Sequence, residues 1–224
     1  MPLKLAVLVS GGGSNLQSII DRIEEGALDA EIRIVLSNKA DAHGLERARK
    51  HSIPAMAIEH AAFPSREAFD AEMVRAIREA GADTVALAGF MRIITPVFLE
   101  AFPGRVVNIH PALLPSFPGV HGQGDAASYG VRISGCTVHF VDEKMDNGPI
   151  IIQAAVPALE NDGGESLGAR ILRLEHRIYP QALQWLAEGR LAVSGRQVRL
   201  ASSERTLAEL RVPALVHPPL EQGF

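Results

Sequence analysis

The beginning of the chain constrains the fold most, because a short apolar run is followed at once by a cluster of glycines. Residues 5–9 read Leu-Ala-Val-Leu-Val, the continuous apolar pattern of a parallel strand that is covered on both faces. Residues 10–15 read Ser-Gly-Gly-Gly-Ser-Asn, and from Leu16 to Ile23 apolar residues recur at helical spacing. The sequence therefore predicts a strand, a tight glycine turn and a helix in succession.

The glycine turn also indicates what kind of ligand could bind. Glycines let the backbone turn tightly, and the N–H groups of the first helical turn can hold an anion. A dinucleotide turn starting at Gly11 would need Gly at position 16, which is Leu16, and a P-loop would need Gly-Lys before Ser or Thr. Both signatures are missing, so a single phosphate is the favoured ligand. A tight turn without any ligand is the alternative.

The alternation of strand and helix continues along the chain. Further strands are predicted at residues 32–37, 53–58, 84–88 and 106–110, with helices at residues 45–51, 65–80 and 96–102. In the second half, strands at 136–141 and 150–156 flank a turn and are expected to be antiparallel, before a helix at 167–186 and a last strand within 190–200. The predicted fold class is α/β, with a doubly wound, mostly parallel but mixed sheet.

Domain organisation is simple on the same evidence. No internal repeat or domain break is visible before residue 201, so residues 1–200 are expected to form a single domain. Residues 201–224 form a polar tail that carries Pro213, Pro218 and Pro219. This tail is expected to pack loosely or to be disordered.

Two polar side chains mark the predicted strand at residues 106–110. Side chains alternate along a strand, so Asn108 and His110 project from the same face. Pro111 ends the strand, which leaves the imidazole at its carboxyl end, where open α/β sheets place their ligands. A buried, hydrogen-bonded pair that only closes the sheet is the alternative. An amide and an imidazole on one face before a proline favour function.

The segment after this strand differs in character. Between Pro111 and Gly124 the chain carries six prolines and glycines, so a long loop of functional or mobile character is expected. Farther on, Thr137 and His139 share one face of a predicted strand. His139 is favoured as a hydrogen-bonded core histidine over a residue that supports a site.

Composition excludes several classes of protein. A net charge of -4 without a basic run gives no support to nucleic-acid binding. The eight histidines and the lone Cys136 show no spacing typical of a structural metal, and one cysteine suits a reducing compartment. The apolar run at residues 5–9 is too short for a signal-peptide core or a membrane span. A cytoplasmic protein that binds neither metal, nucleic acid nor membrane is expected.

Several separate stretches resemble one known family. Ser10–Asn15, Gly89–Ile93, Asn108–Pro115 and Asp146–Pro149 resemble the folate-dependent phosphoribosylglycinamide formyltransferases, over about residues 4–190. The resemblance implies a formyltransferase Rossmann-like fold and transfer of the formyl group of 10-formyltetrahydrofolate to glycinamide ribonucleotide in de novo purine biosynthesis. It also implies that Asn108 and His110 stabilise the tetrahedral oxyanion, while Asp146 holds the imidazole and assists proton transfer.

The resemblance assigns the binding residues as well. Gly13, Ser14 and Asn15 would bind the ribonucleotide phosphate, and Glu175 the ribose hydroxyls. The folate site would be bordered by Arg66, Met91, Arg92, Ile93, Ile94, Asn108, Asp142, Glu143, Lys144, Met145 and Asp146. Two positions depart from the family pattern: Gln123 stands where a second histidine is usual, and Asn147 where glycine is usual.

Three other functions fit the sequence less well than formyl transfer to glycinamide ribonucleotide. A formyltetrahydrofolate deformylase is expected to carry an extra N-terminal domain, for which a first strand at Leu5 leaves no room. A methionyl-tRNA formyltransferase should carry a basic C-terminal domain, and the tail has no basic cluster. A nucleotide-binding module without catalysis would not need Asn108, His110 and Asp146. Small-molecule partners are expected, and a monomer and a homodimer remain open.

Overall fold

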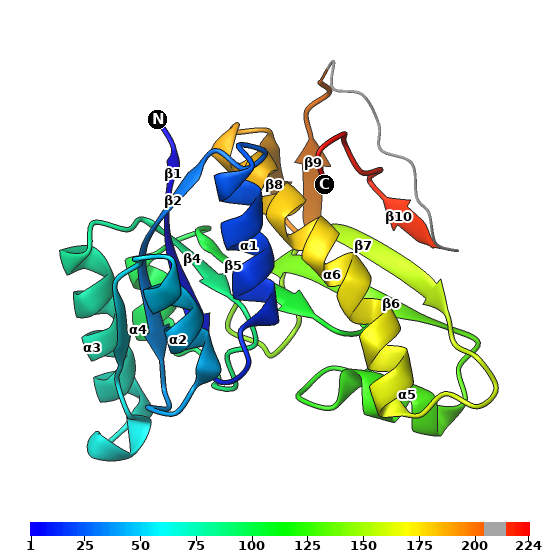
Figure 1. The fold of residues 1–224 in the computed structure, drawn as a ribbon, viewed down its shortest axis with the longest axis horizontal. Coiled ribbons are helices and arrows are strands. Elements are labelled where there is room, and N and C mark those ends of the chain that lie inside the picture. The colour runs from blue at the N-terminus through cyan, green and yellow to red at the C-terminus, as the bar shows by residue number, and fades with distance from the viewer. Residues whose placement is uncertain (204–213) are drawn as a thin grey trace. The chain divides into compact units, whose positions relative to one another are not determined.

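The strands expected in the first half of the chain form a parallel sheet (Figure 1). The computed structural model describes residues 1–203 and 214–224. These divide into one unit of Met1–Asn108 with Val141–Glu143 and a second of Ile109–Phe140 with Lys144–Phe224. Each unit is described by itself below. The expected single domain over residues 1–200 stays a prediction.

The first unit contains the glycine turn. Its strands are β1 (Leu3–Val9), β2 (Ala30–Ser37), β3 (Ala55–Ala57), β4 (Thr84–Leu87) and the first three residues of β5 (Val106–His110), in the order β3-β2-β1-β4-β5; Ile109 and His110 of β5 belong to the second unit. All these neighbours are parallel, as predicted. The chain runs from β1 to β2 and β3 on one side and then reaches β4 on the other side of β1. The topological switch point, where open α/β sheets bind ligands, therefore lies between β1 and β4.

Helices and buried apolar residues complete this unit. Its helices are α1 (Ser14–Glu24), α2 (His43–Lys50), the 3₁₀ turn η1 (His60–Ala62), α3 (Arg66–Glu79) and α4 (Pro96–Ala101). Ser65 caps α3, because its hydroxyl accepts a hydrogen bond from the N–H of Ala68 at 3.1 Å. The buried core packs Leu8 and Leu36 of the sheet against Phe69 and Ile77 of α3. The predicted strand, glycine turn and helix are confirmed.

The second unit is mixed, as expected. Its strands are β6 (Ile133–Phe140), β7 (Ile150–Pro157), β8 (Leu191–Ser194), β9 (Gln197–Leu200) and β10 (Leu215–His217). The order is β6-β7-β9-β8, with β10 beside β7, and β6 and β7 are antiparallel. Its helices are α5 (Gly122–Tyr129) and α6 (Gly164–Ala187). No helix in the described ranges 1–203 and 214–224 has the length and hydropathy needed to cross a bilayer.

Helix α5 contradicts the expectation of a loop that continues to Gly124. The helix starts at Gly122, within the stretch whose glycines predicted irregular backbone. Its small residues pack closely against α6: a Cβ added at Gly164 would meet the Cα of Gly124 at 3.0 Å. A Cβ added at Gly168 would meet the side chain of Gln123 at 3.2 Å. Tertiary packing between two helices therefore overrides the local preference of glycine.

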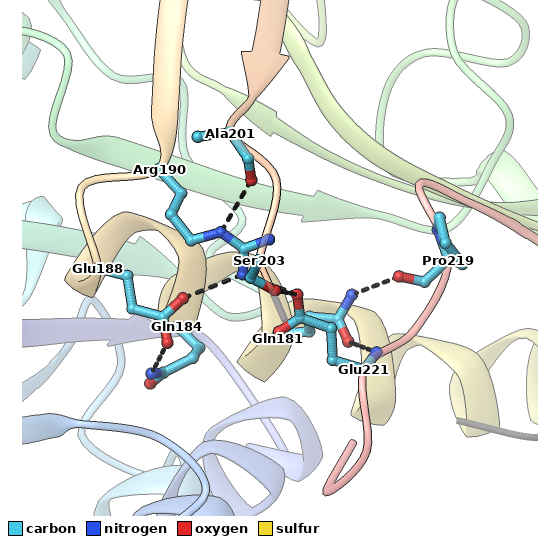
Figure 2. Close-up of polar contacts among 8 residues, drawn as sticks. All are labelled: Gln181, Gln184, Glu188, Arg190, Ala201, Ser203, Pro219 and Glu221. Atoms are coloured by element: carbon cyan, nitrogen blue, oxygen red, sulfur yellow. Dashed lines mark hydrogen bonds and ion pairs between the residues drawn. The ribbon is translucent and has the colours of Figure 1, made fainter. Parts of the chain in front are cut away.

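The end of the chain also differs from the expectation of a loosely packed tail. Residues 215–217 form β10, and Val216, Leu220 and Phe224 are buried. Figure 2 shows how this segment is held by polar contacts: Gln181 of α6 accepts a hydrogen bond from the N–H of Glu221 at 2.7 Å. The buried carboxylate of Glu221 accepts from Arg190 at 2.7 Å and from Ser203 at 2.9 Å. Proline content predicted disorder, but the apolar residues before and after Pro218 and Pro219 decide the packing; Pro213 lies outside the described residues.

Candidate active site

The glycine turn is the first part of the candidate site. Gly13 is the N-cap of α1 with φ 70°, and a Cβ there would come 2.6 Å from the Cα of Gly44. Glycine is therefore required at this position by both conformation and space. Ser14 and Asn15 begin the helix, and Gly13 has no side chain to cap its first N–H groups. This helix start has the features of an anion-binding turn.

Helix α2 holds the same turn from its other side. The N–H of Gly44 donates to the carbonyl oxygen of Gly11 at 2.9 Å. The Nε of Arg47 donates to the carbonyl oxygen of Gly12 at 2.7 Å, and its Nη1 donates to Gln17 at 3.2 Å. Arg47 is not among the predicted site residues, because a charged residue in a short surface helix carries no signal of such a contact. The turn is thus fixed by backbone and side-chain hydrogen bonds.

The segment after β4 is the second part. Met91 and Ile93 are exposed at 55% and 52%, between the buried side chains of Phe90 and Ile94. Two large apolar side chains are thus exposed at the carboxyl end of a sheet. This exposure favours a role in ligand binding over the core role that such residues usually have. Arg66 is exposed at the start of α3, and Arg92 is half-buried. In the same unit, Asn108 and Asp142 are half-buried, and Glu143 is exposed.

His110 and Asp146 lie together in the second unit. Nδ1 of the imidazole is 3.5 Å from Oδ2 of the carboxylate, and both side chains are largely buried. The Nε2 atom of His110 lies 2.8 Å from the carbonyl oxygen of Phe117. The N–H of Gly119 donates to Oδ2 of Asp146 at 2.7 Å. Residues 117–119 therefore contact both members of the pair.

Asp146 also faces a second histidine. Nε2 of His139 lies 3.8 Å from Oδ1 of Asp146, and Nδ1 of the same ring lies 2.8 Å from the carbonyl oxygen of Phe140. His139 is buried, as the sequence favoured, and it also supports the carboxylate. Asp146 has φ 50°, a left-handed conformation that Asp tolerates better than most residues. The carboxylate is consequently fixed between two imidazoles and one backbone N–H.

The remaining candidates of the second unit are spread over two elements. Glu175 lies on α6 and is buried, although a carboxylate rarely is. Burial raises the pKa of the Cys136 thiol well above its ordinary value, and the negative charge of Glu175 adds to the rise. Lys144 and Met145 are exposed on the turn before Asp146. Within the described part of the chain, no group of three or more His, Cys, Asp or Glu residues could hold a metal ion.

Comparison with known proteins places these residues in a family. The model of the formyl transferase family matches residues 3–183. The chain belongs to the formyl transferase family. Phosphoribosylglycinamide formyltransferase of Escherichia coli (strain K12) is 46% identical over 189 residues, which cover 84% of this chain and 89% of that protein. The expected resemblance to such formyltransferases is thereby confirmed.

Two further relatives support this assignment. The trifunctional purine biosynthetic protein adenosine-3 of Drosophila pseudoobscura pseudoobscura is 52% identical over 190 residues, which cover 84% of this chain but 14% of that protein. The chain therefore spans a small part of the trifunctional relatives. Glycinamide ribonucleotide transformylase 1 of Symbiobacterium toebii superposes with a TM-score of 0.89 at 50% identity, covering 90% of this chain and 95% of that one. The predicted α/β fold with a mixed, mostly parallel sheet is confirmed.

Proposed function

We propose that this formyl transferase passes the formyl group of 10-formyltetrahydrofolate to the amine of glycinamide ribonucleotide, a step of de novo purine biosynthesis. The observation that carries the proposal is the buried pair of His110 and Asp146, at 3.5 Å, in a chain 46% identical to a phosphoribosylglycinamide formyltransferase. The imidazole suits proton transfer near neutrality, and the carboxylate lies close enough to hold the ring in its orientation.

The chemistry needs an oxyanion to be stabilised and a proton to be moved. The amine nitrogen of the ribonucleotide attacks the formyl carbon, and the carbonyl oxygen becomes negatively charged. The amide N–H of Asn108 and the N–H of His110 stabilise that oxygen. The bond from carbon to N10 of the folate then breaks, and the proton that the amine loses is delivered to N10 with the help of Asp146.

The binding roles follow from the same proposal. The N–H groups at Gly13, Ser14 and Asn15 hold the ribonucleotide phosphate, and the carboxylate of Glu175 accepts hydrogen bonds from the ribose hydroxyls. The folate lies against the exposed apolar side chains after β4. Its border is formed by Arg66, Met91, Arg92, Ile93, Ile94, Asn108, Asp142, Glu143, Lys144, Met145 and Asp146.

Compartment and assembly belong to the proposal too. The buried, unpaired thiol of Cys136 suits a reducing compartment, so we place the protein in the cytoplasm. The partners are the two small molecules, and the protein acts as a monomer or a homodimer without a bound metal.

One assay separates this function from its competitors. Loss of the formyl group from 10-formyltetrahydrofolate is followed by absorbance with glycinamide ribonucleotide, with methionyl-tRNA and with water alone as acceptor. The proposal expects rapid turnover with the ribonucleotide and slow turnover with the other two. Equal rates with water and ribonucleotide would identify a hydrolase, and a preference for methionyl-tRNA would overturn the assigned acceptor.

A further inference from the structure

A single buried hydroxyl joins three strand ends of the first unit. Ser10, which directly follows β1, is 6% exposed. Its Oγ donates a hydrogen bond to Oδ1 of Asn38, after β2, at 2.5 Å and accepts one from the N–H of Met91, after β4, at 2.8 Å. Its own N–H donates to the carbonyl oxygen of Gly89 at 3.0 Å. Ser10 therefore occupies the topological switch point between β1 and β4.

The direction of these hydrogen bonds is determined by their donors. The N–H of Met91 can only donate, so Oγ of Ser10 is the acceptor there, and its single proton is directed at Asn38. An alanine at this position would leave a buried carbonyl oxygen and a backbone N–H without this partner. Leaving buried polar groups without a partner is more costly than the small net gain from an ordinary hydrogen bond.

The contact to Met91 lies within a segment that is also anchored on both sides. Phe90 and Ile94 are buried on either side, and the N–H of Thr95 donates to Asp70 at 2.7 Å. Between these anchors, Met91 and Ile93 are exposed. The hydroxyl of Ser10 is thus the side-chain contact that sets the backbone at the first exposed residue of the segment.

We propose that Ser10 is a positioning residue for the folate site, holding the backbone of Met91 in place relative to the glycine turn that begins at Gly11. The inference rests on the proposed function, which assigns residues 91–94 to the folate and residues 13–15 to the phosphate. Because Ser10 also forms a hydrogen bond with Asn38, the backbone of Met91 is held in a fixed position relative to the ends of β1 and β2. Removal of the hydroxyl frees Met91 without removing any group that touches a substrate.

Three variants test this role. Ser10→Ala removes the hydroxyl, Ser10→Thr retains it, and Ser37→Ala removes a different buried hydroxyl near the same end of the sheet, one that accepts from the N–H of Lys39 at 3.0 Å. In Ser10→Ala, KM for 10-formyltetrahydrofolate should rise about 5- to 30-fold, the range for one lost buried hydrogen bond. KM for the ribonucleotide and kcat should change less than about threefold on the same argument. Ser10→Thr and Ser37→Ala should behave like the wild type.

Hydrogen exchange supplies a readout that does not depend on turnover. The peptide containing residues 89–93 should exchange faster in Ser10→Ala than in the wild type, while peptides from β1 and β4 should keep their protection. If exchange rises throughout the sheet and KM for the folate stays unchanged, Ser10 has a structural role alone and the proposal is overturned. A wild type without formyl transfer would reject the proposed function, while calorimetry with tetrahydrofolate and the exchange of residues 89–93 would still decide the role of Ser10.

Discussion

The Nε2 atom of His110 lies 2.8 Å from the carbonyl oxygen of Phe117. A carbonyl oxygen only accepts hydrogen bonds, so Nε2 carries the proton and directs it at the protein itself. Nδ1 of the same ring faces Asp146 at 3.5 Å, which leaves Nε2 as the atom that can reach a substrate. In the proposed mechanism, the contact with Phe117 is therefore exchanged for a contact with substrate.

We predict that substrates displace Phe117 from His110. Phe117 has φ 54°, a left-handed conformation that is energetically unfavourable for phenylalanine. The segment therefore loses no favourable backbone geometry when it leaves this position. Nitrogen-15 NMR of the His110 ring should show a changed Nε2 environment when a stable formyl-folate analogue and the ribonucleotide are added. An unchanged Nε2 signal in a turnover-competent complex would contradict this exchange of partners.

His110→Ala and Asp146→Asn should each lower kcat by about 10²–10⁴-fold, the usual contribution of a positioned acid–base group. The reason is that the proposed mechanism assigns to the pair an N–H for the oxyanion and a route for the proton. His139→Ala serves as a comparison, because it removes a neighbour of Asp146 and leaves the pair itself in place. The assignment is wrong if both primary variants are folded and keep near wild-type kcat.

Sequence patterns captured those features that side chains encode locally. The apolar run at residues 5–9 predicted β1, and the alternation along β5 put Asn108 and His110 on one strand. Phe117 and Gly119 could not be found in this way, because they contact His110 and Asp146 through backbone atoms that every residue possesses. Helix α5 was missed because close packing of Gly164 and Gly124, rather than helix propensity, stabilises it.

The glycine turn should prefer a monophosphate, and Arg47 should support that preference. Arg47→Ala removes the hydrogen bond to the carbonyl of Gly12, so the turn becomes less well fixed and the affinity for ribonucleotide falls. A loss of about 5- to 30-fold, or about 1–2 kcal/mol, is expected, which is at the low end for a hydrogen bond to a charged group because this contact is exposed. The control is Arg49→Ala, which removes the same charge from an exposed position of α2. Calorimetry should also show weaker binding of NAD and ATP than of ribonucleotide; the reverse order would reject a monophosphate site.

Gln123 stands where the family resemblance leads us to expect a second histidine, and we predict that this difference is not essential. Its side chain packs toward Gly168 of α6, as a Cβ added there would meet Cγ of Gln123 at 3.2 Å. Gln123→His should consequently change kcat less than about threefold, because the proposed oxyanion donors are Asn108 and His110. If the wild type is inactive with every acceptor and Gln123→His restores transfer, the essential residues have been misplaced.

The final residues of the chain should contribute to stability through their buried side chains. Leu220 is 2% exposed, whereas Leu215 in β10 of the same segment is 71% exposed. Leu220→Ala should lower the free energy of unfolding by about 2–5 kcal/mol, the range for truncation of a buried leucine. Leu215→Ala, the matched control, should change it by about 0.5 kcal/mol or less, as expected of a surface position.

The polar contacts of this segment provide a second measure of the same docking. Arg177 of α6 donates through Nε to the terminal carbonyl oxygen of Phe224 at 3.0 Å, and Arg190 donates to the buried Glu221 at 2.7 Å. Because Glu221 is 4% exposed, Arg190→Ala leaves a buried carboxylate without this charged partner and should also destabilise the protein. The midpoint of urea unfolding, measured for the wild type and for Leu220→Ala, Leu215→Ala and Arg190→Ala, tests this docking. Equal midpoints for Leu220→Ala and Leu215→Ala, with Arg190→Ala unchanged from the wild type, would mean that residues 214–224 do not dock in solution.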